Sequence, residues 1–582
     1  MKRKILIPAF AFVVLVAVFA FSLSGSETRN YKDIYNQKTV NGVVYALDEK
    51  GQYYVKDFFA TDELAQNTTE INIVSEIDGI PVKGISPTYL FSESYPGVDI
   101  ITIDEGIEYI GEKAFSVLDG VKKITLPESV VEIGKGAFSE MESLTEVTLP
   151  SGITEITDDM FLSCSRLLNV NISEKITSVG EYAFAGCRRL SAFQIPESVE
   201  YIGEAAFRGT GLTYIYIPSG VRFTEDGSMH SWFKGCTSLR KVEFGGSKNK
   251  KIIITDYSFS GCSALEEVVL PEAEEIIICE GAFENCKALK RIENAENISC
   301  IGSTAFYNCG FEKIKLPAGI EFKDIESGKN AVSVFENCQK LKTVVFETER
   351  KSLGFLLVEE MFKDCTVLSR VMLPLTDGEI IISDRAFEGC RSLLGVYNTY
   401  SVSLIGEEAF SGCVSLELFV LPEKVTEISE KCFYGCKRLS KIYLHGNLRK
   451  IGDGAFSKCQ KLTDIYYEGR TEEYGRVEKG KGRYKSKIRY ESEYYSLLKG
   501  LRAEVSGTEI RILWEEDSKA DGYRVYTIDG TVLKKEGDIT DTEYIFRDLT
   551  QGQEYSFSVR AYYMVEGEKL LAPQKEIITV TV

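Results

Sequence analysis

The stretch FSEMESLTEVTLPSGITEITDDMF, residues 138–161, decides the fold because close copies of it follow one another along most of the chain. Each copy closes with a phenylalanine, and these are 23 residues apart in eight of the fifteen intervals and 23 to 29 apart in all of them. A fixed period of this size is typical of a solenoid, in which one turn cannot bury its own apolar face and neighbouring turns must stack. The phenylalanines that mark the turns are Phe91, Phe115, Phe138, Phe161, Phe184, Phe207, Phe233, Phe259, Phe283, Phe306, Phe335, Phe362, Phe387, Phe410, Phe433 and Phe456.

Within this stretch, the Leu-x-x-Val-x-Leu phrase at residues 144–149 has apolar residues in alternation, which indicates a short strand. Pro150 ends the strand, because proline has no N–H to donate to a continuing ladder. Ile153 and Ile156 form a second apolar anchor. The segment that follows, usually ending in Ala-Phe, is predicted to form a single helical turn with the phenylalanine inside. Stacking then places equivalent strands in a parallel sheet, about 4.7–4.9 Å apart.

The repeated phrase resembles the BspA-type leucine-rich repeats of bacterial surface proteins over about residues 40–477. It stands here as Ile202-Gly-Glu-Ala-Ala-Phe207 and as Phe410-Ser-Gly-Cys413-Val-Ser-Leu416. This resemblance implies adhesion to host or bacterial surface proteins. Terminal caps are expected as well, since the open ends of a solenoid expose core and strand edges.

The composition changes near the C-terminus, where short alternating strands suggest a β-sandwich. This part resembles a fibronectin type III domain: Trp514 and Tyr523 match core positions, and Leu549 with Tyr555 resembles the corner before the sixth strand. Such domains act as spacers or contact modules, and the fold alone assigns no ligand.

These patterns predict a mainly β chain: a leucine-rich-repeat solenoid with a parallel sheet and single helical turns, followed by a fibronectin type III-like β-sandwich. Five divisions are expected along the chain. They are a signal peptide or signal anchor at 1–26, an N-terminal cap segment at 27–85, the solenoid at 86–477, a basic linker or cap at 478–498 and the fibronectin type III-like domain at 499–582.

The first 26 residues have the pattern of a secretory signal peptide. Lys2, Arg3 and Lys4 precede an apolar run at residues 5–21, and small residues follow. The alternative is an uncleaved membrane anchor, because the run reaches the lower limit for spanning a bilayer. A lipoprotein anchor would require a cysteine near the end of this run, and the sequence has none there. The sequence therefore predicts a secreted or cell-surface protein, with membrane attachment only through an uncleaved N-terminal segment.

The composition argues against several classes of function. With 68 basic and 87 acidic residues the net charge is 68 − 87 = −19, whereas broad nucleic-acid binding needs a basic footprint. Only two histidines, His230 and His445, are present. Phosphate-binding loops, nucleophile elbows, zinc-protease motifs and calcium loops are missing from the sequence. We predict that the protein is not an enzyme and holds no metal or cofactor.

Twelve of the fifteen cysteines occupy one repeat position, three residues after the phenylalanine. Leu118, Met141 and Thr210 replace cysteine there in other turns, so the position accepts an apolar group. The regular spacing predicts free, buried thiols that behave as small apolar side chains, not a disulfide framework. Cys279 and Cys300 lie outside this column on adjacent turns, and we hypothesise that they can approach each other.

The residue between Val and Leu of each strand phrase points out of the core, because side chains alternate between the faces of a sheet. These outward residues are polar in the first four turns, Thr125, Thr148, Asn171 and Gln194, and apolar or aromatic in the last six, Val345, Met372, Tyr397, Val420, Tyr443 and Tyr466. We call these last six residues the stripe; stacked at strand spacing they extend roughly 25 Å. Leu418 and Lys441 lie on the same face. Exposed apolar rows suggest a binding surface, although aromatic and β-branched residues also favour strands in general.

Inserts lengthen several turns in the middle of the solenoid, at residues 224–227, 245–250 and 324–328. They are expected off the main sheet, either as loops that drift in length or as lateral binding loops.

The predicted function is an exported recognition or adhesion protein that binds host or bacterial surface proteins through the stripe with Leu418 and Lys441. One alternative is a polysaccharide-binding envelope component, in which Tyr397, Tyr443 and Tyr466 stack on sugar rings. The other is a purely structural surface protein.

Overall fold

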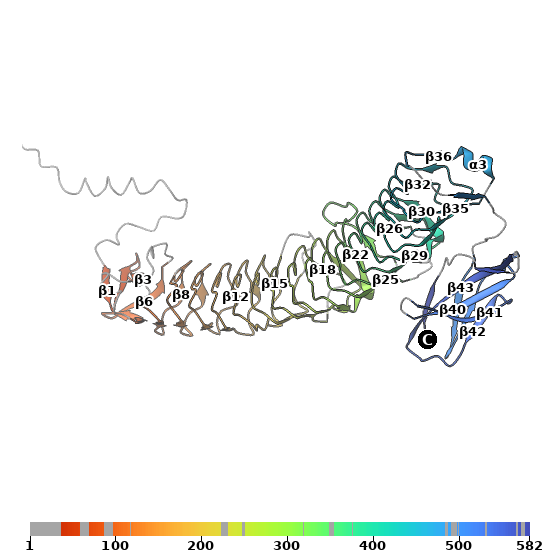
Figure 1. Cartoon of the computed structure of the whole chain (residues 1–582). Coiled ribbons are helices and arrows are strands. Elements are labelled where there is room, and N and C mark those ends of the chain that lie inside the picture. Colours follow the sequence, from red (N-terminus) through yellow and green to blue (C-terminus); the bar gives the residue numbers. More distant parts are fainter. Residues whose placement is uncertain are drawn as a thin grey trace, which may run out of the picture.

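The computed structural model describes residues 37–582 apart from 59–68, 87–96, 117, 223–230, 247–250, 318, 348–353, 375, 469, 483–486, 491–497, 499, 519, 530–531, 566–567 and 572–576. The predicted signal sequence, Phe91 and the insert at 224–227 therefore lie outside the described residues. Figure 1 shows an elongated, curved solenoid and a separate C-terminal β-domain beside its later turns.

Most turns contribute strands to two parallel ladders that run along the solenoid. The first ladder follows the Leu-x-x-Val-x-Leu phrase, with Val147 opposite Val170 as an example of its register. Its strands are β4 (Glu70–Ile73), β7 (Ile100–Ile103), β9 (Lys123–Thr125), β11 (Glu146–Thr148), β13 (Asn169–Asn171), β16 (Tyr214–Ile217), β17 (Lys241–Phe244), β19 (Glu267–Val269), β21 (Arg291–Glu293), β23 (Lys313–Leu316), β25 (Thr343–Phe346), β27 (Arg370–Met372), β29 (Gly395–Tyr397), β31 (Leu418–Val420), β33 (Lys441–Leu444), β35 (Asp464–Tyr467) and β37 (Lys487–Tyr490). The predicted parallel sheet is thus confirmed. Its described strands form four separate sheets, with breaks between β13 and β16, between β21 and β23, and between β29 and β31. At the first break, residues 184–207 are all described but form no strand in this ladder.

The second ladder forms from the Ile-x-x-Ile phrase. Its strands are β6 (Ile80–Ile85), β8 (Tyr109–Ile110), β10 (Glu132–Ile133), β12 (Glu155–Ile156), β14 (Ser178–Val179), β15 (Tyr201–Ile202), β18 (Lys251–Ile254), β20 (Glu275–Ile278), β22 (Ile298–Ile301), β24 (Glu321–Phe322), β26 (Phe355–Leu357), β28 (Ile380–Ile382), β30 (Val402–Ile405), β32 (Glu427–Ile428), β34 (Lys450–Ile451) and β36 (Glu478–Lys479). Two 3₁₀ helices, η2 (Ala295–Asn297) and η3 (Thr399–Ser401), lead into β22 and β30. The sequence alone indicates only an apolar anchor in this segment. It becomes a strand because it pairs with the equivalent segment of the next turn.

The repeat phenylalanines form one continuous column inside the solenoid, as predicted. From Phe115 to Phe456, the ring centroids of successive turns are 5.2 to 5.7 Å apart and the rings are within 19° of parallel. This separation exceeds the strand spacing, as expected for offset rings. Phe193 and Phe419 add further rings against the column.

The segment that carries each phenylalanine differs from the expected single helical turn. The residue two before each phenylalanine of this column has a positive φ, as at Lys113 and Tyr182, and so does the residue two after it, from Phe138 onward. With left-handed residues two before and two after the phenylalanine, every second N–H of the segment points toward the next repeat, and the N–H groups between them bond within their own turn. The N–H of Phe115, for example, donates to the carbonyl of Ala137, 2.8 Å away. A third row of backbone hydrogen bonds therefore joins the turns on the phenylalanine side.

The twelve cysteines of the column are free, as predicted, and all of them except the half-exposed Cys459 are buried. Each of its twelve thiols also donates to the carbonyl of the phenylalanine one turn earlier; the Sγ of Cys164, for example, lies 3.0 Å from the carbonyl oxygen of Phe138. The Sγ to oxygen distances in the other eleven are 3.0 to 3.2 Å. The cysteine is thus a small core residue that also satisfies a backbone acceptor.

Antiparallel strands close the N-terminal end of the solenoid. They are β1 (Gln37–Val40), β2 (Val43–Leu47) and β3 (Tyr53–Phe58), and β3 then pairs in parallel with β6, which β5 (Glu76–Ile77) joins. At the other end, helix α3 (Thr471–Arg476) lies between β35 and β36, and its Tyr474 packs on Tyr467.

The C-terminal domain consists of two antiparallel sheets around a small core. One sheet contains β38 (Arg502–Ser506), β39 (Glu509–Leu513) and β42 (Glu543–Phe546), and the other contains β40 (Gly522–Asp529), β41 (Val532–Ile539), β43 (Glu554–Val565), β44 (Glu568–Leu571) and β45 (Ile578–Thr581). Trp514 and Tyr523 meet edge to face in this core, 5.4 Å apart, as the resemblance implied. Tyr555 fixes the expected corner, since its Oη accepts the N–H of Thr550 at 2.9 Å.

Candidate functional site

The outward residues of the first ladder form a row across neighbouring strands. The consecutive cross-strand neighbours are Lys315, Val345, Met372 and Tyr397 in one sheet and Val420, Tyr443 and Tyr466 in the next. The structure therefore places the stripe in the expected order but in two groups, which end at Tyr397 on β29 and begin again at Val420 on β31.

The first two residues of the stripe are not exposed, contrary to expectation. Val345 is 8 % and Met372 is 5 % exposed, because Ile577 of the C-terminal domain lies over them. Tyr397 and Ile528 are half-buried at the margin of this contact. The alternation of side chains did place both residues on the outer face, but a second domain covers that face here.

The remaining residues of the stripe are partly accessible. Tyr397, Val420, Tyr443 and Tyr466 are half-buried, as is Leu418, whereas Lys441 is exposed. Tyr443 and Tyr466 stack on each other, with ring centroids 4.6 Å apart and an angle of 11° between the rings. A stacked pair of this kind presents ring edges and one outer face, a surface suited to apolar side chains.

Charged side chains frame this apolar surface. Lys441 lies in register between Leu418 and Asp464 on the neighbouring strands. The guanidinium of Arg370 lies 5.9 Å from the ring centroid of Tyr397. Burial raises the pKa of the Tyr397 hydroxyl.

Earlier on the same face, charged side chains form ion pairs, two of them within a strand and one, from Arg291 to Glu267, between neighbouring turns. The Nζ of Lys241 lies 3.1 Å from Glu243, and Arg291 lies 2.8 Å from Glu267 and 3.5 Å from Glu293. Exposed pairs of this kind contribute little to stability, but they satisfy each other's charge. The continuous apolar row is therefore found in the later turns, whereas Tyr216 and Val269 stand singly at outward positions on either side of Glu243.

The insert at 324–328 has a structural role. Asp324 accepts hydrogen bonds from the N–H and the hydroxyl of Ser303 on the previous turn, at 2.7 and 2.8 Å. The insert at 245–250 is described only for its first two residues. The insert at 324–328 is thus held against the solenoid by these hydrogen bonds.

Cys279 and Cys300 lie in one small apolar cluster with Ile253 and Ile277, and both thiols are free. The strand register places Cys300 opposite Ile277, two residues before Cys279. Diagonal neighbours across a sheet are farther apart than a disulfide permits. The two residues approach each other as hypothesised, and the register favours two separate thiols.

Within the described part of the chain, His, Cys, Asp and Glu side chains form no group suited to a metal ion. In the same residues, no helix has the length and apolar character needed to cross a bilayer.

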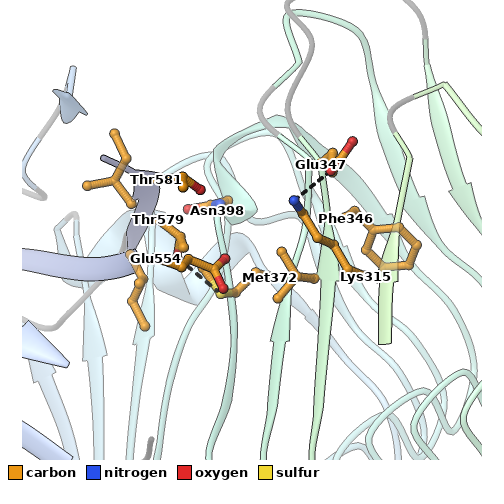
Figure 2. A pocket seen from close by; sticks show the side chains of 11 residues that line it. Lys315, Phe346, Glu347, Met372, Asn398, Glu554, Thr579 and Thr581 are labelled. Carbon is orange, nitrogen blue, oxygen red and sulfur yellow. Dashed lines mark hydrogen bonds and ion pairs between the residues drawn. The ribbon is translucent and has the colours of Figure 1, made fainter. Parts of the chain in front are cut away.

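Sequence reasoning missed the residues of the C-terminal domain that meet the strand face, Glu554, Ile577 and Thr579. The Oγ1 of Thr579 donates to the Sδ of Met372 at 3.8 Å, and Lys313 forms an ion pair with Glu554 at 2.8 Å. A cavity of about 260 Å³ remains beside this contact, and Figure 2 shows Lys315, Met372, Asn398, Glu554 and Thr579 around it. The available signal was Ile577 itself, a bulky apolar residue at an outward position of a strand edge.

Comparison with known proteins gives the family. Copies of the BspA type leucine rich repeat region match overlapping stretches that extend from residue 86 to residue 476, and a fibronectin type III domain matches residues 498–572. Among curated proteins, none matches the sequence.

Several solved structures are similar. A leucine-rich repeat protein from Bacteroides ovatus ATCC 8483 is 25% identical, with a TM-score of 0.54 over 78% of this chain and 99% of the other. A leucine rich cell surface protein from Faecalibacterium prausnitzii A2-165 is 21% identical, with a TM-score of 0.34 over 78% of this chain and 100% of the other. The pneumococcal vaccine antigen PcpA is 18% identical, with a TM-score of 0.40 over 65% of this chain and 100% of the other. With the repeats matched over more than half of its length, the chain belongs to the BspA-type leucine-rich repeat family and carries a C-terminal fibronectin type III domain.

Proposed function

We propose that this protein is an exported recognition protein that binds protein ligands through the open part of the stripe. The observation that carries the proposal is the apolar row of Val420, Tyr443 and Tyr466, with Leu418 beside it, on a face that is ion-paired or polar in its earlier turns. Interfaces are typically built from aromatic anchors within a polar rim. Lys441, which is exposed, belongs to such a rim here, whereas Arg370 is buried beside Tyr397.

Export and a surface location are supported by the signal-like N-terminus, which lies outside the described residues, and by the family. A related protein is itself described as a cell surface protein. We propose the same location for this chain, either secreted or held by an uncleaved N-terminal segment.

The test uses the chain from residue 27 onward, applied to an array of extracellular-matrix proteins, bacterial cells and glycans. A Tyr443→Ala/Tyr466→Ala variant removes both stacked rings. Tyr216→Ala is the matched control, because Tyr216 has the same outward position on β16 in the polar part of the face. We expect binding to a protein ligand to fall at least about tenfold in the double variant, the scale of an interface hot spot, and to persist in the control.

Equal binding by all three proteins would remove the stripe from the proposal. Binding to glycans alone, lost in the double variant, would favour the polysaccharide-binding alternative, with the tyrosines as stacking platforms. Folding of each variant is checked by circular dichroism.

A further inference from the structure

The C-terminal domain faces the solenoid with the outer side of its last strand. Residues alternate along β45: Ile578, Val580 and Val582 pack on the core of the domain itself. Ile577 and Thr579 therefore point the other way, toward the strand face of the solenoid. Figure 1 shows the domain beside the turns that contain β25 and β29.

An apolar contact lies at the centre of this interface. Ile577 is 1 % exposed and forms one buried cluster with Val345 and Met372. An isoleucine at an outward strand position would lie in water if the domain stood away from the solenoid. Its burial is thus specific to the docked arrangement.

Polar contacts surround the apolar centre and fix its register. The Nζ of Lys313, on β23, lies 2.8 Å from the Oε2 of Glu554 at the start of β43. The hydroxyl of Thr579 donates to the sulfur of Met372 (Figure 2). Lys315, two residues from Lys313, pairs instead with Glu347 of the solenoid at 2.7 Å.

The contact is nevertheless small and incompletely packed. Three fully covered apolar side chains and one partly exposed ion pair hold it, and the cavity beside Asn398 separates the two surfaces farther out. Domains of one chain that share only a small interface are expected to move relative to each other.

We propose that the strand face around Val345 and Met372 is the docking site of the chain's own C-terminal domain, and that this domain is a releasable cover over the start of the stripe. When docked, it withholds Val345 and Met372 from ligands and leaves the later residues open. When released, it exposes the whole apolar row. The docking itself does not depend on the proposed function. Only the idea that a ligand competes with the domain for this face rests on that function.

The test measures oxidation of Met372 by hydrogen peroxide in the full chain, followed by peptide mass spectrometry. Met361 is the internal reference, because it is 0 % exposed in the solenoid core. Ile577→Asp removes the apolar centre of the contact. We expect Met372 to be protected in the wild type and to oxidise at least about tenfold faster in this variant, while Met361 is unchanged in both. Val420→Asp is the matched control, an outward substitution on the same face beyond the contact, and should leave Met372 protected.

A second set of variants, which exchanges charges, is used if Ile577→Asp fails to fold. The fluorescence of the buried Trp514 would report such a failure. Glu554→Lys places two cations together and should speed Met372 oxidation by about three- to tenfold, the scale of one surface pair reversed. Adding Lys313→Glu should restore protection. Carbodiimide should also join Lys313 to Glu554 in the wild type.

Rapid oxidation of Met372 in the wild type, or protection that neither substitution changes, would overturn the proposal. Neither result depends on the array experiment. A failure of docking is therefore distinguishable from a failure of ligand binding.

Discussion

The residues two before and two after each phenylalanine adopt a conformation that is unfavourable for most side chains. Asp159 and Glu360 precede their phenylalanines by two residues with φ of 54° and 56°, and Asn285 follows Phe283 with φ of 61°. Such residues persist where surrounding hydrogen bonds over-determine them. Here the N–H groups that these angles orient are bonded to the next turn.

This conformation predicts that glycine stabilises the turn at Thr304, a β-branched residue with φ of 50°. Thr304→Gly should raise the free energy of unfolding by about 1 kcal/mol relative to Thr304→Ala, because glycine adopts positive φ without steric cost. Urea denaturation of the two variants side by side measures the difference. Equal stability would show that the turn stores no strain there.

At the scale of elements, the cysteine column combines burial with a weak hydrogen bond. Burial raises the pKa of the Cys164 thiol to about 12. Because the thiolate is the reactive form, the column should resist alkylation at pH 8 in the folded chain.

We expect iodoacetamide at pH 8 to leave the buried thiols unmodified, with Cys459 reacting first since it is the half-exposed member. All fifteen cysteines should react in urea. Intact and peptide mass spectrometry count the modified sites. Fast modification of Cys164 in the native chain would contradict the burial of the column.

A second element-scale prediction concerns Asp256, two residues after the end of β18. Partial burial, together with Glu280, Glu326 and Asp324, raises the pKa of its carboxyl from 3.8 to about 6. The folded state thus binds this proton more tightly than the unfolded state, so stability falls as pH rises from about 4 to about 6. Asp256→Asn should be more stable than the wild type at pH 7, and the difference should shrink toward pH 4. Thermal unfolding of both proteins across this pH range measures the difference in stability. A difference that does not change with pH, or that has the opposite sign, would contradict the prediction.

Much of this architecture can be predicted from the sequence because the same local pattern recurs in every repeat. The period, the strand phrase, the phenylalanine core, the buried cysteines and the C-terminal sandwich all follow from local patterns. The left-handed turn could not be predicted, because residues as different as Ala205, Tyr182 and Lys431 occupy the same position. The cover on Val345 and Met372 could not be predicted either, since it depends on contacts between residues more than two hundred positions apart.

At the scale of the whole molecule, each turn contacts mainly its neighbours, so energetic coupling should be short-ranged. Phe161→Ala should cost about 3–5 kcal/mol by leaving a cavity in the column. Leu168→Ala, at a 45 % exposed position, is the control and should cost less than about 0.5 kcal/mol.

Double variants test the range of this coupling. Phe161 and Phe184 are 5.4 Å apart, and their joint replacement should deviate from additivity by about 0.5–3 kcal/mol. Phe161 and Phe433 lie many turns apart and should add within about 0.5 kcal/mol. Urea unfolding measures both cycles. Coupling as strong for the distant pair as for the adjacent one would contradict the nearest-neighbour description.

The hydrogen bonds on the phenylalanine side also give the molecule an electrical direction. From Phe115 to Phe433, the N–H of each repeat phenylalanine points to the following turn and donates to the carbonyl of the residue before the next phenylalanine, as in the bond from Phe161 to Ala183. Peptide dipoles that align in this way add together, whereas those of β-ladders largely cancel. Their positive end lies toward the C-terminal turns, the reverse of an α-helix. The solenoid is therefore polarised along its length, and an anionic group at its C-terminal end is favoured by the backbone itself.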